Sequence, residues 1–224
     1  MRISVVIPVL NEESTLASTL DGLQSFSAEV VVVDGGSNDR TREIAEQKRA
    51  TLITSPPGRA RQMNVGAETA SGDVFLFLHA DTYLPPSATA DIVSALQDPC
   101  CVGGRFDIQL DGPGWMFRLI GFLISLRSRW SRVATGDQAI FVRKEVFRSL
   151  GGYPEIPLME DIEFCRRLKK MGKVACLKSH VVTSARRWEK EGVWRTILKM
   201  WALKFLFLIG VSPYRLKRFY GDTR

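Results

Sequence analysis

The segment from Asp73 to Asp81, with the sequence DVFLFLHAD, constrains the fold more than any other part of the chain. Its apolar residues 74–78 form an unbroken run rich in strand-favouring types, which is typical of a parallel strand buried on both faces of an α/β sheet. The run stops at His79 and Asp81. Ligands of open α/β sheets bind beyond the carboxyl ends of the strands, so these two side chains are well placed for chemistry. A solvated turn in which Asp81 caps the next helix fits the pattern equally well.

Strand and helix patterns alternate from the first residues of the chain. Apolar, β-branched runs at 3–7 and 29–34 predict strands, and the segments 11–26 and 40–48 predict helices, the first of them capped by Asn11. This order implies parallel pairing with right-handed crossovers, so we predict an α/β fold with a doubly wound, mostly parallel sheet. Further strands are expected at 52–54, 101–107, 139–142 and 173–177, and further helices at 59–70, 86–96, 115–126 and 160–171.

Composition indicates the class of protein but does not identify its ligand. With 224 residues, 45% of them hydrophobic, the chain is long enough for one well-buried domain with a small appendage. The net charge of +7 suits a polyanion, an anionic membrane or a phosphate-bearing substrate, but no nucleic-acid recognition motif is present. The cysteines lack the spacing of a zinc or redox site, and Met1 leads directly into a strand. We therefore expect a cytoplasmic protein that does not bind nucleic acid.

The last part of the chain changes in character. From Thr183 onward it becomes basic and aromatic, and we divide the chain into a domain at 1–190 and a helical extension at 191–224. The apolar stretches 115–126 and 198–211 are shorter than the roughly 20 residues that a membrane-spanning helix needs. We expect the first stretch in the core. The second fits a basic interfacial helix at the inner face of a membrane, and it fits equally well a helix packed on the domain or on a second copy in a homo-oligomer.

Acidic residues lie at or beside the ends of three predicted strands. Asp34 follows the second strand and is placed to contact a nucleotide ribose or base. Asp81 is suited to hold a divalent cation together with a diphosphate, and Asp161, next to Glu160, is suited to act as a general base. Taken singly, Asp34 fits a turn residue and Asp161 fits a helix cap. Because all of them converge on one edge of one sheet, a shared site is the better interpretation.

These segments together resemble the family 2 glycosyltransferases, enzymes with the GT-A, or nucleotide-diphospho-sugar transferase, fold. The matching segments occur in family order and cover about residues 1 to 190, and the chain is most similar to small bacterial single-domain members with His-Ala-Asp. The segments are Ser4 to Glu12 (SVVIPVLNE), Val33 to Asp39 (VDGGSND), Gly58 to Gly66, Ala70 to Asp81, Gly151 to Tyr153 and the pair Glu160-Asp161.

The resemblance implies an inverting, metal-dependent enzyme that transfers one sugar from a UDP- or GDP-type donor to an unidentified hydroxyl acceptor, for which a lipid-linked molecule is one candidate. Asp81 would hold Mn²⁺ or Mg²⁺ at the leaving diphosphate, and Asp161, with Glu160 beside it, would deprotonate the acceptor hydroxyl. The nucleotide-sugar pocket would be formed by Pro8, Asn11, Glu12, Asp34 and Asn64.

The chain departs from the family pattern at two places, and these limit which residue roles can be carried over to it. His79 replaces the first acid of the Asp-x-Asp metal motif, and a nitrogen ligand favours Mn²⁺ over Mg²⁺. Whether His79 ligates the metal stays open, and His180, the other histidine, is interpreted as structural. The segment before Trp188 lacks the Gln of the processive Gln-x-x-Arg-Trp motif, so single-sugar transfer is favoured. Arg187 would contact the diphosphate and Trp188 the acceptor, although a packed amphipathic surface explains both residues equally well.

Two other functions are compatible with parts of the sequence. The replacement of an acid by His79 fits a degenerate module that binds a nucleotide sugar or a membrane without turnover. A nucleotidyltransferase shares the predicted sheet but uses a glycine-rich loop after the first strand, and the segment 8–13 contains no glycine.

Overall fold

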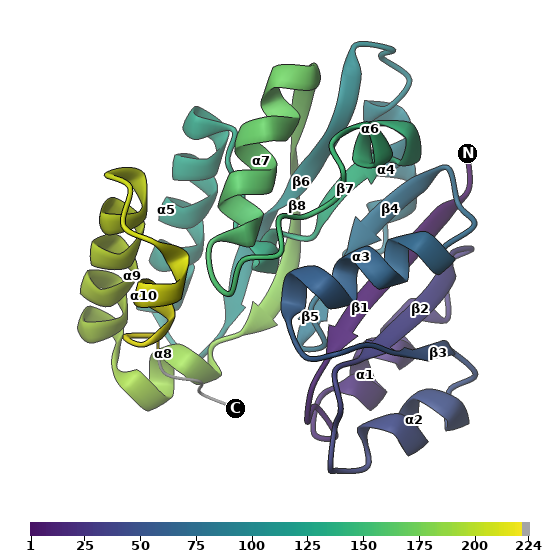
Figure 1. Ribbon diagram of the computed structural model, residues 1–224, viewed down its shortest axis with the longest axis horizontal. Coiled ribbons are helices and arrows are strands. Elements are labelled where there is room, and N and C mark those ends of the chain that lie inside the picture. The colour runs from purple at the N-terminus through teal and green to yellow at the C-terminus, as the bar shows by residue number, and fades with distance from the viewer. Residues whose placement is uncertain (221–224) are drawn as a thin grey trace.

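The computed structural model describes residues 1–220, which form an eight-stranded sheet with helices on both faces (Figure 1). The strands are β1 (Ile3–Val9), β2 (Glu29–Asp34), β3 (Thr51–Thr54), β4 (Val74–Phe77), β5 (Thr82–Tyr83), β6 (Cys101–Asp111), β7 (Ile140–Arg143) and β8 (Lys173–Ser184). The helices are α1 (Leu16–Leu23), α2 (Thr41–Gln47), α3 (Arg59–Thr69), α4 (Ala88–Ala95), α5 (Trp115–Ser131), α6 (Lys144–Ser149), α7 (Glu160–Met171), α8 (Arg186–Glu191), α9 (Val193–Leu208) and α10 (Pro213–Lys217).

The first half of the sheet is parallel, as predicted. Strand β1 lies between β2 and β4 and pairs parallel with both, and β3 adds a parallel edge beyond β2. Every residue of β1 is buried because the two faces are covered by different helices. Ile7 packs in one core cluster with Leu16 of α1, whereas Val6 packs in the other with Met63 of α3. This alternation is the period of two that a strand buried on both faces requires.

The second half of the sheet is mixed. Strand β7 pairs antiparallel with both β4 and β6, and β6 pairs parallel with β8. Strand β8 extends to Ser184, beyond the predicted end at residue 177, because its last residues pair with β6 on one side and with the short strand β5 on the other. There the hydroxyls of Thr82 and Thr183 lie 2.9 Å apart, and the Ser184 amide donates to the carbonyl of Asp81. The late strand thus holds the turn that carries Asp81.

The loop after β1 differs from the prediction. Helix α1 begins at Leu16 rather than directly after Asn11. Asn11 has a left-handed backbone, with φ of 54°, and its side-chain oxygen accepts the amide hydrogen of Asn38. Asn11 therefore does not cap the helix: it joins the loop after β1 to the loop after β2, a contact between segments that local sequence patterns do not encode.

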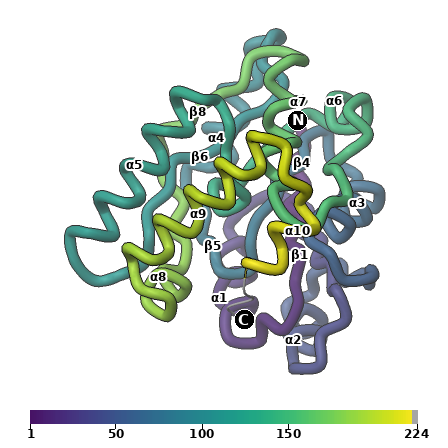
Figure 2. The backbone as a smooth tube through the Cα atoms, turned by 60° about the vertical axis from the view of Figure 1, so that its left-hand side comes forward, coloured from purple at the N-terminus to yellow at the C-terminus, as the bar shows by residue number. Residues whose placement is uncertain are grey.

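Helices α8 to α10 fold back onto the domain, and Figure 2 shows α9 and α10 crossing in front of the strands. Leu203 of α9 and Leu216 of α10 are buried in the same core cluster as Phe164 of α7. In residues 1–220, no helix is long and apolar enough to cross a membrane.

Candidate functional site

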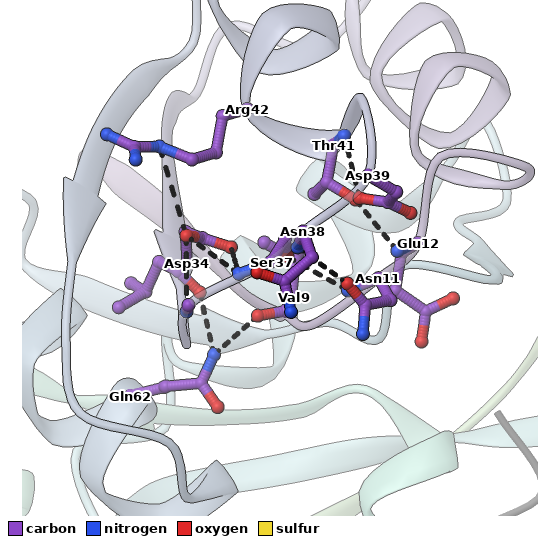
Figure 3. A network of polar contacts seen from close by, with 12 residues as sticks. Val9, Asn11, Glu12, Asp34, Ser37, Asn38, Asp39, Thr41, Arg42 and Gln62 are labelled. Carbon is purple, nitrogen blue, oxygen red and sulfur yellow. Dashed lines mark hydrogen bonds and ion pairs between the residues drawn. The ribbon is translucent and has the colours of Figure 1, made fainter.

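The carboxyl ends of β1 and β2 are joined by a polar network (Figure 3). The buried carboxylate of Asp34 accepts the amide hydrogens of Gly36 and Ser37 at 3.2 and 3.1 Å, and Arg42 Nε lies 3.9 Å from it. These contacts are those of a turn-forming carboxylate. The described contacts of Asp34 therefore shape the loop, and its contact with a nucleotide stays a prediction.

Asn11 and Glu12 take part in the same network. The Asn11 amide donates to Ser37 Oγ at 2.9 Å, and the Glu12 amide donates to Thr41 Oγ1 at 2.8 Å (Figure 3). The Glu12 carboxylate is buried and lies 3.6 Å from Arg186 of α8. The C-terminal segment thus reaches the loop that follows the first strand.

Sequence analysis missed Gln62, which organises this edge from helix α3. Its side-chain Nε2 donates to the carbonyls of Val9 and Val33 at 2.7 and 2.8 Å, at the ends of the two central strands (Figure 3). The side chain is buried. A glutamine on the otherwise apolar, buried face of a helix is a signal of such a role, because a buried amide needs partners.

A second set of residues forms a small pocket at the end of β4. Asp161 lies there at the start of α7, and its carboxylate accepts the amide hydrogens of Gly136 and Ile162, both at 2.7 Å. His79, from the end of β4, approaches the same glycine. The residues that line the pocket are Pro8, Arg59, Met63, Phe77, Leu78, His79, Gly136, Ile140, Tyr153, Glu160 and Asp161.

Gly136 is the second residue that sequence analysis missed. A side-chain Cβ at this position would lie 2.7 Å from His79 Nε2 and 3.8 Å from Asp161 Oδ2. No real Cβ approaches another atom that closely, so only glycine lets the imidazole and the carboxylate share this space while the backbone amide holds Asp161. The predicted metal residue His79 and the predicted base Asp161 are therefore neighbours in one pocket.

Glu160 lies beside Asp161 in a more buried environment. Burial and the neighbouring Asp161 raise the pKa of Glu160 to about 7, and Arg59, whose Nη1 lies 3.8 Å from Glu160 Oε1, opposes the shift. Burial also raises the pKa of Asp137, with the charge of Asp161 adding to the effect. Carboxyl groups whose pKa is raised by burial and by a neighbouring acid are typical of catalytic sites.

The raised pKa of Glu160 leads to a prediction on stability. A carboxyl group whose pKa is higher in the folded state binds an extra proton there between about pH 4.5 and about pH 7. The free energy of unfolding must therefore fall as the pH rises through this window. We expect Glu160→Gln to remove that fall, so that the variant gains stability relative to the wild type between about pH 5 and about pH 8.

Urea unfolding at several pH values measures this effect, which should be on the order of a few kcal/mol. Glu163→Gln, on the same helix, is the matched control and should keep the wild-type pH dependence. A Glu160→Gln curve parallel to that of the wild type would contradict the assignment.

The residues at the turn after β4 suit a divalent cation only in part. In the described portion of the chain, no three His, Cys, Asp or Glu side chains are grouped so that they hold a metal by themselves. Mg²⁺ and similar ions are often held by one or two protein ligands, with substrate phosphates completing the shell. Asp81, which is partly exposed, and His79 fit that arrangement. His180 is exposed on β8 and does not line the pocket that contains His79.

The remaining predicted residues make structural contacts. Asn64 donates to the carbonyl of Tyr153 and accepts its amide hydrogen, at 2.9 and 2.8 Å, so both ends of its side chain hold the glycine turn before α7. Arg187 donates to the hydroxyl of Tyr220 and stacks on its ring. Trp188 is half-buried against the core. Ligand contacts by these three side chains stay predictions.

Arg59 connects the pocket to the C-terminal segment. The acids Glu160, Asp161 and Asp81 and the hydroxyl of Tyr220 raise the pKa of Arg59 against the effect of its burial. The basic side chains Arg187, Lys199 and Lys217 all lie against the ring of Tyr220. A concentration of positive charge therefore lies beside the acids of the pocket, as an anionic substrate requires.

Comparison with known proteins places this arrangement in a family. Residues 4–151 match the family model described as glycosyl transferase family 2. A probable glycosyltransferase, YdaM of Bacillus subtilis, is 26% identical over 97% of this chain and 59% of its own length. A dolichol-phosphate mannosyltransferase of Pyrococcus furiosus is 32% identical over 47% of this chain and 34% of its own length. The chain thus spans less than two thirds of either relative.

Solved structures agree on the fold. The Staphylococcus aureus TarS fragment 1–349 in complex with UDP-GlcNAc superposes with a TM-score of 0.64 and 22% identity, over 82% of this chain and 58% of that one. Glucosyl-3-phosphoglycerate synthase of Mycobacterium tuberculosis, in complex with Mn²⁺ and UDP-glucose, superposes with a TM-score of 0.63 and 21% identity, over 94% of this chain and 80% of that one. The predicted GT-A fold is confirmed.

Proposed function

This chain belongs to glycosyl transferase family 2 and is a glycosyltransferase; we propose that it transfers a single sugar, with inversion and with the aid of a divalent cation, from a nucleotide-diphosphate donor to a hydroxyl acceptor. The observation that carries the proposal is the pocket in which Asp161, held by two backbone amides, lies beside His79 at the end of β4. A base fixed in this way fits an attack on the anomeric carbon from one defined side.

In the proposed reaction Asp161 acts as the general base. The acceptor oxygen forms a bond to the anomeric carbon while the bond from that carbon to the diphosphate breaks. The hydroxyl proton passes to the Asp161 carboxylate, and the diphosphate leaves with the electron pair. The amides of Gly136 and Ile162 fix the carboxylate, so its remaining lone pairs are oriented before the substrate arrives.

His79 and Asp81 would hold Mn²⁺ or Mg²⁺, which would supply charge neutralisation at the leaving diphosphate. Arg59 and Arg187 add fixed positive charge near the same place. The M. tuberculosis neighbour with Mn²⁺ and UDP-glucose supports this assignment by likeness of fold. Pro8, Asn11, Glu12 and Asp34 form the proposed nucleotide side of the site.

We assign a UDP- or GDP-type donor and a lipid-linked acceptor at the inner face of the membrane. Relatives from P. furiosus and Aeromonas hydrophila are named as transferases of dolichol phosphate and undecaprenyl phosphate, and the TarS and synthase neighbours were solved with UDP-sugars. A degenerate module that binds a nucleotide sugar without turnover is the second candidate, because His79 stands where the family has an acid.

The proposal is tested first by thermal stabilisation of the purified protein with UDP-, GDP- and dTDP-sugars, each with Mn²⁺, Mg²⁺ or EDTA. We expect one nucleotide class to raise the free energy of unfolding by about 3 kcal/mol at a hundredfold excess over Kd, and EDTA to abolish the gain. Free nucleosides serve as the control for non-specific binding. Stabilisation by no donor in a folded protein would refute donor use. Binding without transfer to any lipid extract would favour the degenerate module.

A further inference from the structure

Helix α5 carries a row of large apolar side chains that point away from the domain. We predicted that this stretch lies in the core, but only one side of it is buried. Phe117 and Ile120 lie on that side, which packs over β6. The reason is that α5 is apolar on nearly all sides, so its sequence does not indicate which face is covered. The exposed apolar residues, with their exposed fractions, are Trp115 (70%), Leu119 (43%), Phe122 (57%), Leu123 (51%), Leu126 (36%) and Trp130 (88%).

Helix α9 shows the same pattern. Its buried residues, Thr196 and Leu203, are turned toward the domain. On the other side, residues spaced by three or four positions form a second exposed stripe. They are Trp194 (73%), Leu198 (70%), Trp201 (74%), Phe205 (63%) and Leu208 (55%). A monomeric soluble protein rarely leaves stripes of this size uncovered, so each marks a contact with something else.

The two helices lie side by side in both views of the backbone, and Figure 1 shows them on the side of the molecule away from β3 (Figures 1 and 2). Burial and the charge of Arg127 of α5 lower the pKa of Lys204 of α9 to about 8. This effect of one helix on a side chain of the other is consistent with their proximity. Helix α5 is anchored to β6 by the ion pair of Arg129 with the buried Asp107, and by Arg105 of β6, which donates to the carbonyl of Ser125 at 3.3 Å. The two stripes therefore belong to one firmly supported surface.

The charges around this surface have one sign. The segments 112–136 and 192–220 contain no Asp or Glu, although the chain has 24 such residues. Five arginines of these segments are exposed: Arg118, Arg132, Arg195, Arg215 and Arg218. Four of the five tryptophans of the chain are exposed here. Tryptophan and arginine around an apolar stripe are the composition of helices that lie in the interface of an anionic bilayer.

We propose that the exposed faces of α5 and α9 together form a docking surface for the anionic surface of a lipid bilayer, in which both helices lie flat with their apolar residues below the headgroups. Helix α5 contributes to this surface as much as helix α9 does. Because Leu203 of α9 is buried in the same core cluster as the pocket residues Met63 and Tyr153, docking would bring the proposed catalytic residues close to the membrane. The inference rests on surface composition alone and does not depend on the proposed reaction.

A second copy of the chain fits this surface less well. In a symmetric dimer the same patch meets itself, so the exposed arginines of one copy would face those of the other. No acid in either segment compensates them. Like charges brought together at an interface are costly, whereas anionic headgroups neutralise them.

The test is flotation of the full chain with vesicles of phosphatidylcholine alone or with added phosphatidylglycerol. We expect the protein to float with the anionic vesicles, and less so as salt is raised. Phe122→Glu on α5 and Trp201→Glu on α9 should each lower the bound fraction at limiting lipid by about tenfold, since each removes a large apolar side chain from the lipid. The control is Met171→Glu, an exposed apolar residue of α7, which should bind like the wild type.

Circular dichroism of each variant confirms that it is folded. Protein that stays at the bottom with both vesicle types overturns the proposal, as does equal binding to neutral and anionic vesicles. Binding weakened by Trp201→Glu but not by Phe122→Glu overturns the role of α5. A lipid-free dimer in sedimentation equilibrium that both variants dissociate, without vesicle binding, would assign the surface to a second copy.

Discussion

Asp161→Asn is expected to lower kcat for sugar transfer by about 10²- to 10⁴-fold, the range that a positioned general base contributes. The amides of Gly136 and Ile162 donate to different oxygens of Asp161, so asparagine keeps an acceptor for only one of them. The loss of one such hydrogen bond should leave the fold intact. What the variant loses is the ability to take the hydroxyl proton. Donor binding should therefore stay near the wild-type level while turnover collapses.

The measurement is transfer of labelled sugar from the donor identified by thermal stabilisation to a lipid extract, with donor Kd determined in parallel. Two neighbouring variants make the result specific. Glu163→Gln, on the outer side of α7, should behave like the wild type, and Glu160→Gln should lose less than Asp161→Asn. Turnover retained in Asp161→Asn but lost in Glu160→Gln would move the base to Glu160, whose pKa of about 7 suits proton transfer near neutrality.

The second large effect is expected at Asp81. Asp81→Asn removes a carboxylate that we assign to the cation at the diphosphate, so the donor-induced stabilisation that depends on Mn²⁺ or Mg²⁺ should vanish. At a hundredfold excess of donor over Kd this is a loss of about 3 kcal/mol. The turn itself should survive, because it is held through the Asp81 carbonyl, which accepts the Ser184 amide, and not through its side chain.

Thermal stabilisation with and without EDTA checks this prediction. Asp111→Asn, an exposed aspartate at the end of β6, is the control and should retain the full metal-dependent gain. His79→Ala then separates two roles of the imidazole. A metal ligand should change the preference between Mn²⁺ and Mg²⁺, whereas a mere neighbour of Asp161 should leave that preference intact. Full stabilisation of Asp81→Asn by donor and metal would remove Asp81 from the cation site.

Much of the fold could be predicted because its signals are local. The apolar runs of β1, β2 and β4 and the breaks after them are contiguous, and β2 ends at Asp34 as expected. The alternation of strand and helix then leaves few ways to arrange the first half of the sheet. Strand β5 and the extension of β8 were missed because they depend on pairing with distant segments: β5 pairs with β8, 101 positions away at Thr82 and Thr183, and the extension of β8 also pairs with β6.

The residues of the candidate site also fall into those that local sequence signals indicated and those that only the tertiary structure revealed. Residue types and their positions at strand ends indicated Asp34, Asp81 and Asp161 as a group. Of these three, only Asp161 lines the pocket at the end of β4, where the lack of a side chain at Gly136 lets His79 approach it. The raised pKa of Glu160 was likewise invisible in the sequence, because it arises from burial and from the charge of Asp161, with Arg59 opposing the shift.

By itself, the sequence determined the α/β class, the parallel half of the sheet and the family, since all three depend on short segments read in order. Only the tertiary structure decided which faces are covered. Helix α5 is apolar around its circumference, and nothing in its residues distinguishes Phe117, which is buried, from Phe122, which is exposed. That difference is set by contact with β6, because burial is a property of neighbours brought together by the fold and not of the residue itself.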